Sequence, residues 1–140
     1  ALKQAQLLGY AETDPTADVE GWDSAGKTLI LAAAIFGVSL TLDAMPVTGI
    51  SHITRAAVEE AQQNGERWKL IAQVTTEGGR IEPVRLPFND PLAGVGGASN
   101  AVTFTTDLLG NVTIVGPGAG RVQTGFGLLS DLIDISRRNS

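Results

Sequence analysis

The first part of the chain carries apolar residues at helical spacing. The pattern predicts helices over residues 2–8, 22–36 and 55–64. Each helix is followed by a glycine that suits a helix C-terminus, namely Gly9, Gly37 and Gly65. Thr54 is a suitable N-cap for the third helix. Between the first two helices, residues 10–21 are rich in Asp, Glu, Thr and Pro, which predicts a turn-rich segment. Residues 45–50 are expected to be a short extended piece.

From residue 68 onward, apolar and polar residues alternate, which is the period of a β-strand. Strands are predicted over residues 68–74, 80–86, 100–106 and 112–115, with Pro83 marking an edge or a bulge. Turns are predicted at residues 78–79 and 109–111, and a loop rich in Gly and Pro at 89–97. The chain closes with a helix whose apolar stripe contains Val122, Phe126, Leu129 and Ile133.

This order of elements predicts an α+β fold. We expect a mostly antiparallel, or mixed, β-sheet with helices packed on one face. The alternating βαβ units of a nucleotide-binding domain are missing from the pattern. The longest apolar run, residues 28–42, is shorter than the roughly 20 residues that cross a bilayer, so we interpret it as part of a buried core helix.

Composition narrows the functional classes. The chain has 140 residues, enough for one domain with its own core. Fifteen acidic residues against ten basic ones, a net charge of −5, do not provide the cationic face that duplex nucleic acid or an anionic membrane requires. With no Cys and only one His, no metal site is expected. The chain opens on Ala1, inside a helical pattern without a cap, which favours a piece of a longer protein.

One candidate site is the glycine-rich sequence GPGAG, residues 116–120, which joins the last strand to the last helix. Backbone N–H groups ahead of a helix can bind a phosphate. The sequence is not the GxGxxG dinucleotide motif, because Arg121, Val122 and Gln123 follow Gly120. Two readings stay open: a tight structural turn, or a surface that touches one edge of a ligand held mainly elsewhere.

The second candidate is the acidic sequence from residue 9 to residue 27. Asp23 and Lys27 are spaced to share one face of a helix, and Glu12, Asp14 and Asp18 precede them. A capped helix start with a surface ion pair would explain the pattern without any function. Alternatively, the carboxylates bind an ammonium group and a partly desolvated lysine donates or accepts a proton.

This segment resembles the signature of homoserine dehydrogenase, GY-[AT]-E-x-D-P followed by D-[VL]-x-G-x-D-x-x-x-K. The matching residues are Gly9, Tyr10, Ala11, Glu12, Asp14, Pro15, Asp18, Val19, Gly21, Asp23 and Lys27. The resemblance continues in VTGISHIT (47–54), WKLIAQ (68–73), PLAGVGGASNAV (91–102) and GPGAGRVQTGFGLLSDLIDI (116–135), so it covers nearly the whole chain. Gly26 is a departure, since the family usually has a larger residue there. Gly125, Phe126 and Gly127 also replace residues that are often Ala or small aliphatics.

The resemblance implies an enzyme that reduces L-aspartate 4-semialdehyde to L-homoserine with NADPH or NADH, a step toward threonine, methionine and isoleucine. It implies that Lys27 is the general acid/base and that Asp23 shares the catalytic site. It also implies that Glu12, Asp23, Tyr10 and Asp18 form the substrate site, with Asp18 supporting Lys27. Gly120 and Thr124 match positions near the cofactor. These assignments agree with the chemistry, because an aldehyde that accepts hydride develops alkoxide charge, which a positioned ammonium group stabilises.

The resemblance also implies what lies outside this chain. In the family an N-terminal Rossmann domain binds most of the cofactor, so residues 1–140 correspond to the catalytic, substrate-binding and dimerisation domain alone. We therefore expect a cytoplasmic homodimer whose isolated chain is inactive, with the Thr-rich face of residues 101–105 as part of the dimer contact. The alternative is a non-catalytic dimerisation or small-ligand-binding module on the same scaffold.

Overall fold

The computed structural model describes residues 2–9 and 11–139, and its elements follow the predicted order. The helices that precede the strands are α1 (Leu2–Leu7), α2 (Thr16–Val19), α3 (Trp22–Phe36), the 3-10 turn η1 (Leu42–Ala44) and α4 (Arg55–Gln63). The three predicted helices of this part are confirmed to within one residue at each end. The single turn α2 lies in the segment for which only turns were predicted, because four residues are too few to show a helical period.

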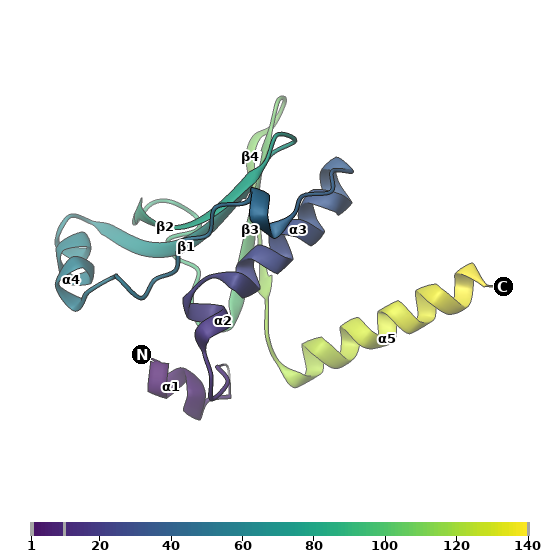
Figure 1. Ribbon diagram of the computed structural model, residues 1–140, viewed down its shortest axis with the longest axis horizontal. Helices are drawn as coiled ribbons and strands as arrows, with labels where there is room; N and C mark the ends of the chain where they lie inside the picture. Colours follow the sequence, from purple (N-terminus) through teal and green to yellow (C-terminus); the bar gives the residue numbers. More distant parts are fainter. Residues whose placement is uncertain (1, 10, 140) are drawn as a thin grey trace.

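Two antiparallel hairpins follow. Strands β1 (Glu66–Val74) and β2 (Gly79–Pro87) form the first, and β3 (Ser99–Thr106) and β4 (Gly110–Pro117) form the second. The α+β class and the antiparallel pairing are confirmed, but the strands form two separate sheets in the described chain rather than one (Figure 1). The connection between β2 and β3 crosses the open face of the first hairpin, where Arg67 and Lys69 donate to the carbonyl oxygens of Ala93 and Val95. This route carries β3 away from the edges of the first sheet.

The core lies between the first hairpin and α3. Ala25 of α3, Met45 and Ile81 of β2 are buried there, with Leu29, Val47 and Leu70 packed around them. Antiparallel register pairs Trp68 with Arg85 and Leu70 with Pro83, so the residues that face α3 and those that face α4 lie on the same side of the hairpin. Both helices therefore cover one face of this sheet, as predicted.

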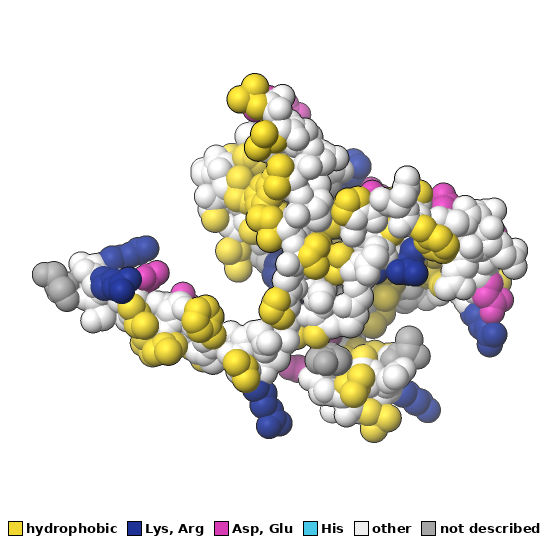
Figure 2. All heavy atoms as spheres, turned by 180° about the vertical axis from the view of Figure 1, so that it is seen from behind, with side chains coloured by type: hydrophobic (Ala, Val, Ile, Leu, Met, Phe, Trp, Pro, Cys, Tyr) yellow, Lys and Arg dark blue, Asp and Glu magenta, His cyan; other side chains and the backbone are white. Residues whose placement is uncertain are grey.

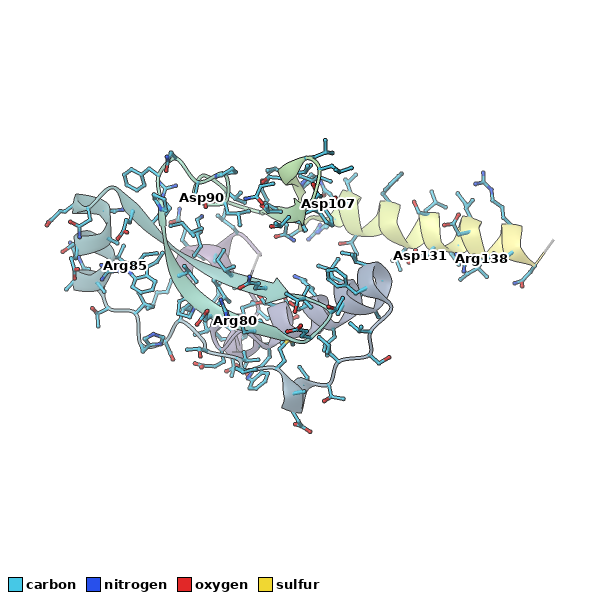
Figure 3. The ribbon with its side chains drawn as sticks, turned by 90° about the horizontal axis from the view of Figure 1, so that it is seen from above. Arg80, Arg85, Asp90, Asp107, Asp131 and Arg138 are labelled. Carbon is cyan, nitrogen blue, oxygen red and sulfur yellow. The ribbon has the colours of Figure 1, made fainter. Side chains whose placement is uncertain are left out.

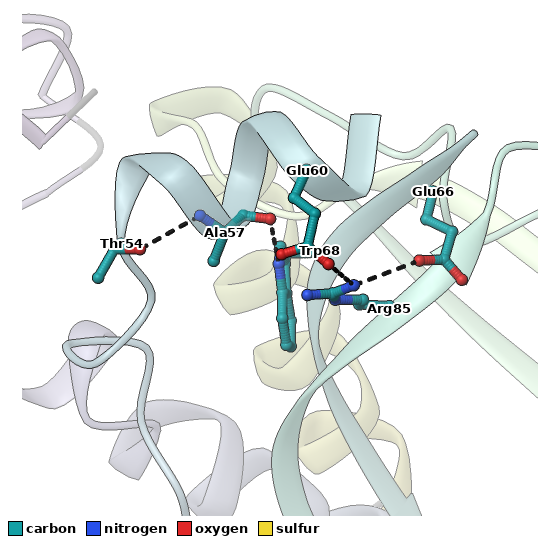
Figure 4. Close-up of polar contacts among 6 residues, drawn as sticks. All are labelled: Thr54, Ala57, Glu60, Glu66, Trp68 and Arg85. Carbon is teal, nitrogen blue, oxygen red and sulfur yellow. Dashed lines mark hydrogen bonds and ion pairs between the residues drawn. The ribbon is translucent and has the colours of Figure 1, made fainter. Parts of the chain in front are cut away.

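Helix α4 is joined to that face through Trp68 (Figure 4). The indole Nε1–H of Trp68 donates to the carbonyl of Ala57 at 3.1 Å, and the Arg85 guanidinium lies 5.1 Å from the centre of the Trp68 ring system. Arg85 also pairs with Glu60 of α4 at 3.0 Å. Thr54 caps α4 by accepting a hydrogen bond from the Ala57 N–H, as the sequence predicts.

Helix α5 (Arg121–Arg138) extends away from the rest of the molecule (Figure 1). From above, its residues Asp131 and Arg138 lie well apart from Arg80 and Arg85 of β2 (Figure 3). The predicted apolar stripe is present, but its side chains are exposed, for example 71% at Phe126. Figure 2 shows these side chains as a yellow band along the helix.

Helix α3 also differs from the expected buried core helix. Only Ala25, Thr28 and Ala32 are buried, whereas Ile30 is 70% exposed, because the sheet covers one side of the helix alone. No helix in the described chain is long and apolar enough to cross a membrane. Among the same residues, no group of His, Asp and Glu is arranged to bind a metal ion.

Candidate active site

The candidate site begins where α2 passes into α3. Gly21 makes this connection with a φ of 84°, a left-handed conformation that favours glycine. A Cβ at Gly21 would lie 3.2 Å from Val47 and 3.3 Å from Ile81, so close packing also restricts this position. The first turn of α3 is thereby fixed against the core, and Asp23 lies in that turn.

Asp23 and Lys27 form an ion pair on the outer side of α3. The Lys27 Nζ lies 2.6 Å from the Asp23 Oδ2, as the spacing of four residues predicts. Both side chains are about half exposed, 59% for Lys27 and 45% for Asp23. A pair with this exposure contributes at most about 1 kcal/mol to stability, so the folding of α3 does not depend on it.

The pair points away from the core. With about 3.6 residues per helical turn, Asp23 and Lys27 lie roughly opposite the buried Ala25, Thr28 and Ala32. The exposed Ile30 shares their side of the helix. A Cβ at Gly26 would meet no atom within 4 Å, so a larger residue is sterically acceptable beside the pair. The arrangement presents a carboxylate and an ammonium group to a ligand or a surface outside the described chain.

The acidic segment, residues 12–20, presents further carboxylates near the start of α3. The side chains of Glu12 and Asp18 are exposed, and the Asp18 backbone carbonyl accepts a hydrogen bond from the Gly21 N–H. The ion pair of Lys27 is made with Asp23, and none with Asp18 is present among the described residues. Tyr10, the other candidate substrate contact, lies outside the described residues.

Asp14 stabilises the turn within this segment. Its Oδ1 accepts hydrogen bonds from the Thr16 hydroxyl at 2.6 Å and from the Thr16 N–H at 3.1 Å. These bonds favour the charged carboxylate and lower the pKa of Asp14 below its ordinary value. Asp14 thus orders the entry to α2, and its Oδ1 is already used inside the chain.

Two residues that sequence reasoning left without a role contact the acidic segment. Gln6 of α1 donates from its side-chain amide to the carbonyls of Glu12 and Thr13. Gly49 lies against the backbone of Val19 and Glu20. A glycine in an extended segment is a known signal of close backbone approach, so Gly49 had a detectable signal, whereas nothing in the sequence marks Gln6.

The glycine-rich turn before α5 ends at Gly120. Gly120 precedes the helix with a φ of 141°, and its carbonyl accepts the Thr124 N–H at 2.9 Å in the first helical turn. This backbone conformation is one that L side chains rarely adopt, which favours glycine at this position.

Comparison with known proteins shows the family to which this chain belongs. The family model of homoserine dehydrogenase matches residues 1–133. This chain belongs to the homoserine dehydrogenase family. An NAD(+)-dependent homoserine dehydrogenase of Pseudomonas canavaninivorans is 47% identical over 140 residues, which cover 96% of this chain and 40% of that protein. A homoserine dehydrogenase of Methanocaldococcus jannaschii is 46% identical over 135 residues, with the same two shares of 96% and 40%.

Solved structures of homoserine dehydrogenases have the same fold. One from Thiobacillus denitrificans has a TM-score of 0.85 at 41% identity, over 97% of this chain and 32% of the other. A hyperthermophilic archaeal homoserine dehydrogenase in complex with NADPH has a TM-score of 0.79 at 29% identity, over 98% of this chain and 39% of the other. The chain therefore spans well under half the length of these relatives, which are named as homoserine dehydrogenases.

Proposed function

We propose that this chain is the catalytic, substrate-binding and dimerisation domain of a homoserine dehydrogenase. The reaction is the NAD(P)H-dependent reduction of L-aspartate 4-semialdehyde to L-homoserine, and a Rossmann domain outside residues 1–140 completes the site. The observation that carries the proposal is the Asp23–Lys27 pair, which projects from the uncovered side of α3 in a chain matched by this family along almost its whole length.

Lys27 is the proton donor for reduction and the acceptor for the reverse reaction. When bound, the nicotinamide cofactor supplies the hydride. The Lys27 ammonium group then stabilises the alkoxide charge that develops on the substrate oxygen and transfers a proton to it. Asp23, 2.6 Å from the Lys27 Nζ, orients that ammonium group in the absence of substrate. Without Asp23, the long lysine side chain would sample several rotamers.

The substrate amino group is bound by carboxylates. An amino-acid aldehyde carries an ammonium group, for which the exposed Glu12 and Asp23 carboxylates are suitable acceptors. Tyr10 is assigned to the same subsite, and Asp18 adds negative charge beside it. Asp14 is not assigned to substrate, because Thr16 already donates two hydrogen bonds to its Oδ1.

The cofactor is NAD or NADP, and this domain contacts only its edge. The backbone N–H groups after Gly120 fit an anionic or polar edge of a dinucleotide, with Thr124 in the same turn. Most of the cofactor would be held by the Rossmann domain, which also contains the residues that discriminate the ribose 2′ position. The named relatives include one NAD(+)-dependent enzyme and one solved with NADPH, so both cofactors remain candidates here.

We assign the homodimer contact to the second hairpin. The Thr-rich face singled out by the sequence pattern uses its hydroxyls internally, since the hydroxyl oxygens of Thr103 and Thr113 are hydrogen-bonded at 2.9 Å. The opposite face exposes apolar side chains, including Val102 at 36% and Ile114 at 61%. An exposed apolar sheet face is the kind of surface that self-association covers. A cytoplasmic location is part of the same proposal.

The test is the Lys27→Ala substitution in the complete enzyme. Loss of a general acid/base lowers kcat by about 10²- to 10⁴-fold, measured as NAD(P)H formation from homoserine. Arg55→Ala is the matched control, because Arg55 and Glu59 form an exposed pair of the same spacing on α4, at 2.7 Å. The control is expected to keep its full rate.

A Lys27→Ala enzyme that retains its rate would contradict the role of Lys27. It would also favour the alternative, a non-catalytic dimerisation or ligand-binding module. The family match over residues 1–133 disfavours that alternative.

A further inference from the structure

The acidic segment, residues 12–20, is held at both ends by residues outside it. We propose that Gln6 and Gly49 are positioning residues that set where this segment, and with it Glu12 and Asp18, lies relative to α3. The inference rests on the proposed function, in which these carboxylates bind the substrate ammonium group. It adds two residues that have no direct contact with substrate and that act through the backbone of the segment.

Gln6 holds the first end. Its side-chain Nε2 lies 3.0 Å from the Glu12 carbonyl oxygen and 3.3 Å from the Thr13 carbonyl oxygen, so the two protons of one amide group serve two consecutive carbonyls. The Ala11 N–H also donates to the Ala5 carbonyl of α1, at 3.3 Å. These bonds tie the backbone of Glu12 to α1, while its carboxylate stays free and exposed.

Gly49 holds the second end. A Cβ at this position would lie 2.5 Å from the Cα of Glu20 and 2.6 Å from the carbonyl oxygen of Val19, distances at which the two backbones must separate. The absence of a side chain allows the Ile50 N–H to donate to the Val19 carbonyl at 2.8 Å. Glycine is therefore the only residue type small enough for the two backbones to approach this closely at position 49.

The support behind Gly49 is rigid. Residues 46–50, the support segment, run along the outer edge of β2. There the Ile81 N–H donates to the Pro46 carbonyl at 2.9 Å, and the Thr48 N–H donates to the Ile81 carbonyl at 2.8 Å. Ile81 is buried in the core, so the support segment is fixed to the core itself. The position of the segment end at Val19 and Glu20 is thus set by the core through Gly49.

The acidic segment needs these external contacts because it has little stability of its own. Its helix α2 is one turn long, begins after Pro15 and has no side-chain N-cap bond. A helix of this length does not persist in water without tertiary contacts. Asp18 is part of α2, so a displaced turn moves this carboxylate relative to Asp23 and Lys27.

The experiment compares Gln6→Glu and Gly49→Ala in the complete enzyme. Gln6→Glu keeps the shape of the side chain, but it replaces the NH2 group that donates both hydrogen bonds with a carboxylate oxygen, which repels the Glu12 and Thr13 carbonyls. We expect both substitutions to raise the KM for homoserine about 10- to 100-fold, the range that small misplacements of binding groups produce. KM for the cofactor and kcat should change less than about threefold, because Lys27 and Gly120 belong to other elements.

Two controls match the chemistry of the substitutions. Gln4→Glu introduces the same charge into α1 at an exposed side chain, and Gly78→Ala adds a Cβ where no atom lies within 4 Å. Both are expected to keep the KM for homoserine of the parent enzyme. A general effect of charge in α1, or of Gly→Ala substitution, would appear in these controls and would contradict the proposal.

The outcomes separate this inference from the proposed function. If Lys27→Ala abolishes turnover while Gln6→Glu keeps the parent KM for homoserine, the positioning role is wrong and the proposed function stands. If Lys27→Ala also keeps its rate, the proposed function is wrong. A fall in kcat with an unchanged KM for homoserine would also overturn the positioning role. Should Gly49→Ala fail to fold, Gln6→Glu alone decides.

Discussion

Replacing Trp68 with Phe is expected to loosen α4 from the first hairpin. The substitution keeps an aromatic ring against Arg85 but removes the indole N–H that donates to the Ala57 carbonyl at 3.1 Å. The bond is partly buried, so losing it costs about 0.5–1.5 kcal/mol. At 25 °C this corresponds to about a 2- to 13-fold increase in the population of the state in which α4 is detached.

Arg85 offers an independent measure of the same contact. Its guanidinium stacks on Trp68 at 5.1 Å and pairs with Glu60 at 3.0 Å. The stack contributes about 0.5–1 kcal/mol, and the ion pair, whose Glu60 side chain is 60% exposed, contributes at most about 1 kcal/mol. The stack joins β1 to β2, so Arg85→Met should loosen α4 through loss of the ion pair alone, by at most about 1 kcal/mol.

The assay is native-state hydrogen exchange of the complete protein, read for peptides of α4 and β1. Exchange of the α4 amides reports the local opening that these contacts oppose, and it does not require two-state unfolding of a multidomain protein. Arg80→Met is the matched control, since Arg80 lies on the opposite face of β2 and pairs with Glu82 at 2.7 Å. If Trp68→Phe changes α4 exchange less than twofold, the hydrogen bond to Ala57 does not hold the helix.

Two further predictions follow. Partial burial, and secondarily the charge of Arg67, lowers the pKa of Lys69 below its ordinary 10.5. Between the folded pKa and 10.5, the unfolded chain therefore binds more protons than the folded chain. The free energy of unfolding consequently rises with pH in that window. Thermal melting at a series of alkaline pH values should show this rise in the parent protein and a smaller one in Lys69→Met, and equal rises would contradict the assignment. The isolated 140-residue chain should sediment as a dimer and fail to oxidise NADPH with aspartate semialdehyde, and turnover by this chain would refute the division of the site between two domains.

Local pattern was sufficient for most of the elements. The start of α3 at Trp22, its end at Gly37 and the Thr54 cap of α4 are all as the sequence predicts, because each depends on helical period and on the conformational preference of one residue. Asp23 and Lys27 were predicted to pair for the same reason, since a spacing of four residues fixes their separation once the helix forms.

Tertiary structure decided everything that depends on contacts between distant segments. Only the folded chain shows that Gln6 and Gly49 hold the acidic segment, because their partners, the backbones of Glu12 and Val19, have no side-chain signature. It also shows that the apolar stripe of α5 remains exposed in the described chain, although its spacing is that of a core-facing helix. The spacing of apolar residues predicts which side chains share one face of a helix, whereas the surface that covers this face is decided by the rest of the folded protein.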